Sequence, residues 1–106
     1  MSGIIGLVKA AAGIKLLFLP HAVRQMARPD RMITVEDVRH CIFHGELIED
    51  YPEDARGCSC LMLGTGDPGR PIHVVCSPKE GYLSIITAYE PDPKEWETDW
   101  KTRRPL

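Results

Sequence analysis

The spacing of apolar residues changes at Gly45, and this change constrains the fold more than any other feature of the sequence. Before it, Val38 and Ile42 recur at helical spacing behind Thr34, which forms a capping box with Asp37. After it, the chain alternates between short β-type runs and breaks rich in Gly and Pro. The runs cover residues 46–50, 60–64, 71–76 and 83–89.

A second helix is predicted before the capping box. The short apolar run 16–19 ends at Pro20, and proline fits the first turn of a helix over residues 21–28. Because the strands then follow one another with short turns, neighbours pair antiparallel. The sequence therefore predicts an α+β fold, with two N-terminal helices packed on an antiparallel sheet of about four strands.

The two ends of the chain have patterns of their own. Residues 1–14 form an apolar extension broken by glycines, and residues 15–92 form the single α+β domain. The last part, residues 93–106, is predicted to contain a short helix followed by a basic tail. Asp92 and Pro93 match the N-cap and the first position of that helix. Trp96 and Trp100 would share one face of that helix and pack it against the sheet.

Charge is small in sum but uneven along the chain. The net formal charge is −2, yet residues 1–31 hold five basic residues and one acid, whereas residues 45–54 hold acids and no base. A local positive face is therefore expected without general affinity for polyanions. No apolar stretch is long enough for a membrane span. We expect a soluble, cytoplasmic protein with no membrane contact.

Two histidines are candidates for acid–base chemistry. His21 lies just inside the first helix, where the helix dipole favours the neutral imidazole that a base requires. His73 lies in the middle of an apolar strand. Each also fits a structural role as a partly buried, hydrogen-bonded side chain, and the sequence leaves both interpretations open.

Three arginines accompany these histidines. Arg24 and Arg28 are four residues apart on the helix of His21, and Arg70 precedes the strand of His73. Clustered guanidinium groups suit phosphate binding. The alternative is a solvated helix face with a few charge pairs.

Metal binding is the less favoured interpretation of three other patterns. His40 and His44 share a helix face, Cys58 and Cys60 alternate along a strand, and residues 49–54 are acidic. None has the ligand spacing of a zinc or calcium motif. We therefore expect no metal site and no other cofactor, with the four cysteines reduced.

Taken in order, many short segments resemble a small bacterial family, domain-of-unknown-function family 4258, over about residues 15–92. The matching pieces include Phe18 to Ala22, Met26, Arg28, Ile33-Thr34, Gly45-Glu46, Glu49 to Pro52, Leu63-Gly64, Arg70 to Val75 and Ile86 to Pro91. Members of that family resemble RelE/ParE-like toxins in layout. Some are encoded beside small zinc-binding proteins of antitoxin type.

The resemblance implies a metal-independent ribonuclease toxin, or a non-catalytic relative that binds a protein partner or forms a homo-oligomer. The expected partners are RNA and a small zinc-binding antitoxin-type protein. Cleavage of RNA by its own 2′-hydroxyl needs a base, an acid and cations beside the phosphate. The predicted site assigns His21 and His73 as the acid and base, Arg24, Arg28 and Arg70 as phosphate ligands, and Tyr89 as a hydrogen-bond donor or base stack. This assignment requires the start of the first helix to lie near the strand of His73.

Overall fold

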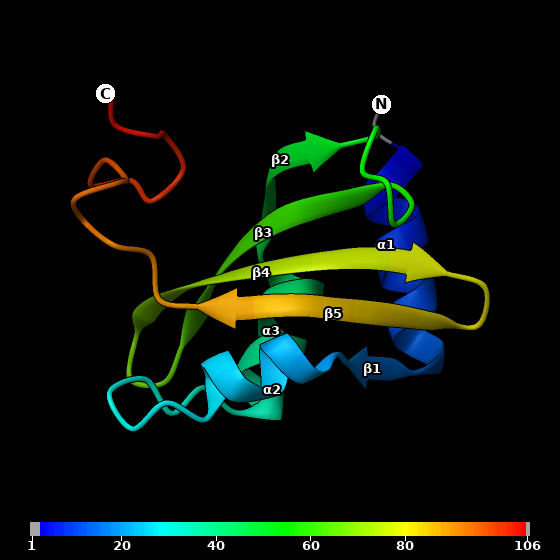
Figure 1. Cartoon of the computed structure of the whole chain (residues 1–106), viewed down its shortest axis with the longest axis horizontal. Helices are drawn as coiled ribbons and strands as arrows, with labels where there is room; N and C mark the ends of the chain where they lie inside the picture. Colours follow the sequence, from blue (N-terminus) through cyan, green and yellow to red (C-terminus); the bar gives the residue numbers. More distant parts are fainter. Residues whose placement is uncertain (1–2, 106) are drawn as a thin grey trace.

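A computed structural model describes residues 3–105 as three helices and one five-stranded sheet. In chain order the elements are α1 (Gly3–Ile14), β1 (Leu16–Phe18), α2 (Pro20–Met26), α3 (Val35–His44), β2 (Glu46–Tyr51), β3 (Ser59–Gly66), β4 (Arg70–Lys79) and β5 (Tyr82–Tyr89). The sheet order is β1-β5-β4-β3-β2. In the view of Figure 1, α1 and α3 lie behind the sheet, and α2 runs along its β5 side.

The α+β class and the four consecutive antiparallel strands are confirmed, but the predicted layout is incomplete. Strands β2 to β5 pair antiparallel in sequence order. A fifth strand, β1, pairs parallel with β5, with Leu16 opposite Leu83. The apolar run before Pro20 is therefore a strand, and the sheet is mixed rather than purely antiparallel.

Helix α3 begins and ends at the predicted residues. The Thr34 hydroxyl accepts from the Asp37 amide at 3.0 Å, and the Asp37 carboxylate accepts from the Thr34 amide at the same distance. Gly45 ends the helix with extended backbone rather than the left-handed turn of a typical C′ glycine. Contact with β3 requires glycine here instead, because a Cβ on Gly45 would collide with the Leu63 carbonyl. A Cβ on Gly64 would likewise lie 2.6 Å from the Cys41 Cα, so α3 lies directly on β3.

Helix α1 contributes to the core although its residues were predicted only as an extension. It contacts both β4 and β5. Its buried side chains are Ile4, Val8, Ala11 and Ala12. Burial of these side chains stabilises the fold in proportion to the apolar area that they remove from water. Residues 3–14 therefore belong to the same hydrophobic core as the helices and strands that follow.

The predicted C-terminal helix is wrong. The Asp92 carbonyl accepts from the amides of Glu95 and Trp96, but this single turn does not continue. The Asp99 carboxylate accepts from the amides of Lys101 and Thr102 and turns the chain back. Trp96 then forms an antiparallel bridge with Arg103. We name residues 91–105 the C-terminal segment.

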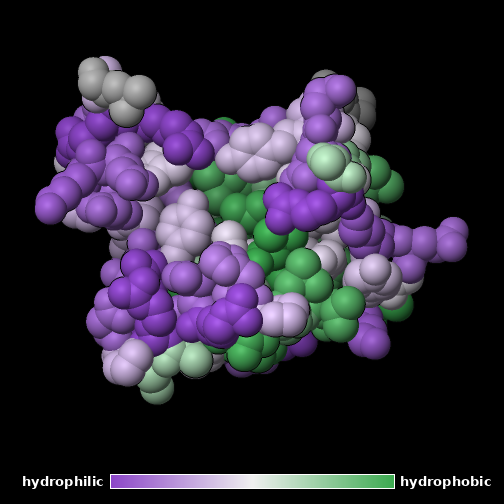
Figure 2. Space-filling model, in the orientation of Figure 1, coloured by the Kyte–Doolittle hydropathy of each residue, from purple (hydrophilic) through white to green (hydrophobic). Residues whose placement is uncertain are grey.

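The two faces of the sheet have different coverings. Side chains alternate between faces along a strand, so Ile72, Val74 and Cys76 pack under the helices while His73 and Val75 point the other way. On this helix-free face the C-terminal segment lies at one end and the β2–β3 loop at the other, where the Ser77 hydroxyl donates to the Cys58 carbonyl. Figure 2 shows hydrophobic residues on the floor of a hollow between them. No helix within residues 3–105 is long and apolar enough to cross a membrane.

Candidate functional site

His73 is the centre of a polar cluster on the helix-free face of the sheet. It lies in β4 and is fully buried. The C-terminal segment covers it, with the Trp96 ring edge-on at a centroid distance of 4.5 Å. Trp96 itself is 2% exposed, so this residue forms the lid over the imidazole.

Both ring nitrogens of His73 have partners. Nε2 lies 2.8 Å from the Trp100 carbonyl oxygen. A carbonyl oxygen only accepts, so Nε2 carries the hydrogen, and Nδ1 of the neutral ring is an acceptor. The Tyr89 hydroxyl lies 3.4 Å from Nδ1 and donates to it. Cross-strand pairing of His73 with Tyr89 fixes this contact.

An ion pair anchors the C-terminal segment beside this histidine. The Arg103 guanidinium donates to both carboxylate oxygens of Glu49, at 2.8 and 2.9 Å. The same guanidinium lies over the Trp96 ring, 4.6 Å from its centroid. The Tyr51 hydroxyl also donates to Glu49. A second pair, between Lys101 and Glu46 at 3.0 Å, joins the segment to the start of β2.

The cluster shifts the protonation of its members. Burial lowers the pKa of His73, against the opposing effects of the Trp100 carbonyl and the Glu49 carboxylate. Burial also raises the pKa of Tyr89. Hydrogen bonds from Arg103 lower the pKa of Glu49. At neutral pH the cluster therefore holds a neutral imidazole, a neutral phenol and a charged Glu49–Arg103 pair.

The lowered pKa of His73 makes stability depend on pH. The unfolded chain binds a proton near the ordinary histidine value of 6.5, whereas the folded chain resists it. The stabilisation by neutral His73 is thus present above that value and is lost as the pH falls through the lower folded pKa. We expect the urea midpoint to fall between pH 7.5 and 5.5, and to fall less in His73→Gln. His21→Gln, at an exposed position, is the control. If the urea midpoint changed equally with pH in the wild type and both variants, the expectation would be contradicted.

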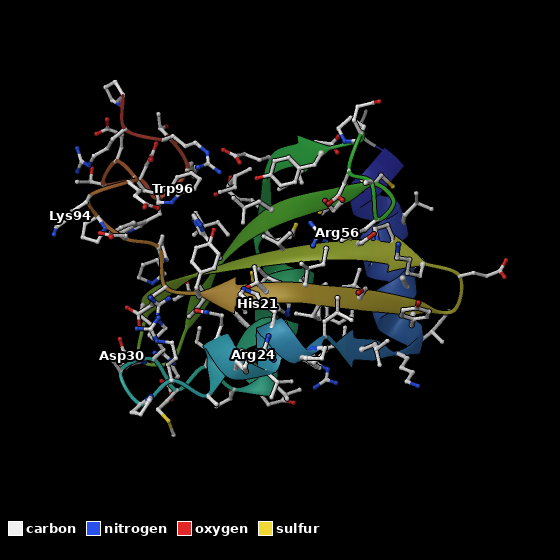
Figure 3. All side chains as sticks on the ribbon, in the orientation of Figure 1. His21, Arg24, Asp30, Arg56, Lys94 and Trp96 are labelled. Carbon is white, nitrogen blue, oxygen red and sulfur yellow. The ribbon has the colours of Figure 1, made fainter. Side chains whose placement is uncertain are left out.

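The predicted site residues on α2 do not join this cluster. His21, Arg24 and Arg28 are exposed on α2 and just beyond it. Figure 3 shows His21 and Arg24 on α2 and Trp96 in the C-terminal segment, in separate parts of the molecule. The aromatic rings packed on His73 are those of Tyr89 and Trp96, and the imidazole of His21 does not pair with it. The structure thus brings His73 and Tyr89 together and leaves the α2 group apart from them.

Arg70 is held in a separate network. Its guanidinium lies 2.9 Å from the Glu90 carboxylate and 3.4 Å from that of Asp37. It also donates to the carbonyl oxygens of Arg31 and Met32. The side chain is only 18% exposed. Arg70 therefore ties the loop between α2 and α3 to β4 and to the end of β5, and these bonds already use its terminal nitrogens.

Sequence reasoning missed the other half of the cluster. Glu49 belongs to the acidic run 49–54 and Arg103 to the basic tail, and nothing local to either segment predicts that they meet. The complementary charges of these two segments were the available signal. Spacing could not reveal the contact, because the Asp99 turn that brings Arg103 back to Trp96 depends on tertiary packing.

Histidines on α3 and cysteines on β3 and β4 form two close pairs, and the partner of Cys60 is Cys76 rather than Cys58. The rings of His40 and His44 have centroids 4.8 Å apart on α3. The Sγ atoms of Cys60 and Cys76 lie 3.8 Å apart in the core as free thiols. Within residues 3–105 no three His, Cys, Asp or Glu side chains are grouped closely enough to hold a metal ion.

Comparison with known proteins identifies a family but no characterised relative. No match was found among curated proteins, and none among solved structures. The likeness to RelE/ParE-like toxins is not confirmed by these comparisons and stays a prediction. The family model described as "Domain of unknown function (DUF4258)" matches residues 18–90. This match runs from the last residue of β1 to the residue after β5 and includes Glu49, His73 and Tyr89, so the chain belongs to the DUF4258 family.

Proposed function

We propose that the protein is a metal-independent ribonuclease whose chemistry is centred on His73 and Tyr89. The observation that carries the proposal is the hydrogen-bonded chain from the Trp100 carbonyl through His73 to the Tyr89 hydroxyl. A base oriented by a third group, and itself in contact with a proton-carrying side chain, is the arrangement that proton transfer requires. Tyr89 is half-buried whereas His73 is fully buried, so Tyr89 is the hydrogen-bonded group that substrate can reach.

The reaction that fits this arrangement is attack by the RNA 2′-hydroxyl on the adjacent phosphorus. Tyr89 takes the 2′ proton as its own proton passes to Nδ1 of His73. The 2′ oxygen then bonds to phosphorus while the bond to the 5′ oxygen breaks. The 5′ oxygen leaves as a hydroxyl after taking a proton from water, and His73 later returns its proton to solvent. The products are a 2′,3′-cyclic phosphate and a 5′-hydroxyl end.

Arg103 supplies the positive charge nearest to this reaction. Its charge acts on both His73 and Tyr89. A guanidinium with two parallel donors matches two phosphate oxygens as well as it matches the Glu49 carboxylate. In this proposal the phosphate takes over donors from Glu49 as negative charge grows on it. The predicted phosphate contacts of Arg24 and Arg28 lie outside this centre and remain predictions.

The test is cleavage of a fluorogenic RNA oligonucleotide by the purified chain in the presence of EDTA. Tyr89→Phe keeps the ring and removes the hydroxyl, and we expect the rate to fall about 100-fold. Tyr82→Phe, at the opposite end of β5, is the matched control with an unchanged rate. DNA of the same sequence should remain intact, because it lacks the 2′-hydroxyl. A folded wild-type chain that leaves RNA intact, or a Tyr89→Phe variant with full activity, would refute the proposal.

A further inference from the structure

An apolar groove lies between α2 and the start of α3, away from the His73 cluster. Its volume is about 430 Å³, and its lining is almost wholly apolar. The residues that line it are Phe18, Val23, Met26, Ala27, Ile33, Thr34 and Val35. Val23 is 53% exposed and Val35 is 45% exposed, so two aliphatic side chains face solvent at its rims. An apolar groove left open to water is typical of a surface that binds another protein.

Positive charge lies beside this groove. Arg24 follows Val23 on the exposed side of α2, and within residues 3–105 it makes no ion pair. Arg28 lies just beyond the end of α2 and pairs with Asp30 at 3.4 Å, with about half or more of each side chain exposed. An exposed pair of this kind is worth little and exchanges readily. At the other rim, Glu36 is already paired with Arg39 at 2.6 Å. The unsatisfied charge beside the groove is therefore cationic.

We propose that this α2–α3 groove docks an acidic amphipathic segment of a different protein. Apolar side chains of the segment fill the groove, and its carboxylates pair with Arg24 and Arg28. A helix with apolar residues on one side and acids on the flank presents both features together. Phe18 is the one aromatic residue of the lining, and it is partly buried against the core. The groove therefore favours a peptide over a nucleic acid, because bases bind by stacking on accessible aromatic or guanidinium planes.

A second copy of the chain does not fit as the occupant. Its acidic residues gather in two segments, 46–54 and 90–99, and several of them are already paired. The ion pairs are Glu46 with Lys101, Glu49 with Arg103, Asp54 with Arg56 and Glu97 with Arg104. The exposed large apolar side chains in the described part of the chain all lie at or before Val35. The acids nearest to those apolar side chains in sequence, Asp30 and Glu36, are themselves paired with Arg28 and Arg39. No segment of the described chain therefore combines unpaired acids with large exposed apolar side chains. The partner must be another protein.

The proposed docking is tested with two synthetic helical peptides that share one apolar face of leucines. The first carries Glu on the flanking positions, and its twin carries Lys. We expect the Glu peptide to bind the full chain at least 10-fold more tightly at low salt, and to weaken as salt screens the charges. Arg24→Glu should reverse this preference. Equal affinity for the two peptides, or no binding of either, would overturn the proposal.

Val23→Asp should weaken binding of the Glu peptide at least 10-fold. Leu7→Asp is the matched control, because Leu7 is 57% exposed on α1 and does not line the groove. Both positions are exposed, so both variants should fold, which circular dichroism checks. Full binding by Val23→Asp would overturn the proposal. So would self-association in sedimentation that Val23→Asp abolishes, because it would make a second copy the occupant. RNA binding that Arg24→Glu abolishes, with no peptide bound, would instead assign the surface to nucleic acid.

The peptide measurements are independent of the proposed ribonuclease activity. They use no RNA cleavage, and Val23 lies outside the His73 cluster. If the protein binds the Glu peptide but does not cleave RNA, the docking proposal is supported and the nuclease proposal is refuted. If it cleaves RNA but does not bind the peptide, the reverse holds.

Discussion

Replacing Arg70 with methionine is expected to lower the free energy of unfolding by about 3 kcal/mol. The substitution keeps most of the apolar stem but removes the hydrogen bonds that Arg70 itself donates to Asp37, Glu90 and two backbone carbonyls. Asp37 is 8% exposed and would lose its cationic partner. Urea unfolding measured at neutral pH gives the comparison directly.

Arg24→Met is the control for this experiment. Arg24 is exposed on α2, so its replacement should change stability by less than about 0.5 kcal/mol. A large loss in Arg70→Met alone would identify Arg70 as a residue that holds the fold. If the two variants were equally stable, the Arg70 network would contribute little to the stability of the fold, and the expectation would be wrong.

Replacing Trp96 with alanine is expected to cost about 3 to 4 kcal/mol. Trp96 is the largest fully buried side chain of the described chain, and it fixes the C-terminal segment over β4. Its removal should also let water reach His73. Because burial is the main cause of the lowered pKa, the imidazole pKa should rise toward its ordinary value, which histidine NMR titration measures.

Trp100→Ala is the matched control. The Trp100 side chain is only half-buried, and the carbonyl that accepts from His73 belongs to the backbone and stays. We expect a loss of about 1 kcal/mol and little change in the His73 pKa. An equal stability loss in both variants, with the His73 pKa unmoved by Trp96→Ala, would show that Trp96 is not the residue that shields the imidazole.

Local signals predicted α3 and the four antiparallel strands correctly. The capping box at Thr34 and the alternation of β-type runs with Gly and Pro depend on neighbours in sequence, so they can be recognised without tertiary information. Strand β1 is different. It has three residues, and its partner, Leu83 and onward, is separated from it by most of the chain. A run this short predicts no strand until the distant partner is known.

In the C-terminal segment the error is the reverse, because a helix is predicted there and none forms. Asp92 and Pro93 are a sound local start for a helix, and the amides that follow do make one turn. Burial of Trp96 and the turn at Asp99 then outweigh that preference. Helix propensity is worth tenths of a kcal/mol for each residue, whereas a buried tryptophan is worth several.

For the candidate site, the sequence predicts some of the residues but not the contacts between them. His73 and Tyr89 were both selected by residue type, but their contact follows from the register of β4 and β5. The pairing of Glu49 with Arg103 joins residues far apart in sequence and was not predicted. The bonds of Arg70 could not be predicted either, because they depend on where the loop between α2 and α3 crosses β4.

The parallel pairing of β1 with β5 determines the order in which the chain can fold as it is synthesised. β1 leaves the ribosome early, but its partner strand follows only after β2, β3 and β4. The antiparallel strands have neighbouring partners and can pair as they emerge, whereas the pairing of Leu16 with Leu83 is the last of the strand pairings and carries the largest loop entropy among them. Helix α1 packs on both β4 and β5, so its packing is complete only once β5 has joined the sheet. A nascent chain that stops before β5 therefore leaves part of its apolar N-terminal region exposed to solvent. Aggregation is expected to be most favourable at this stage.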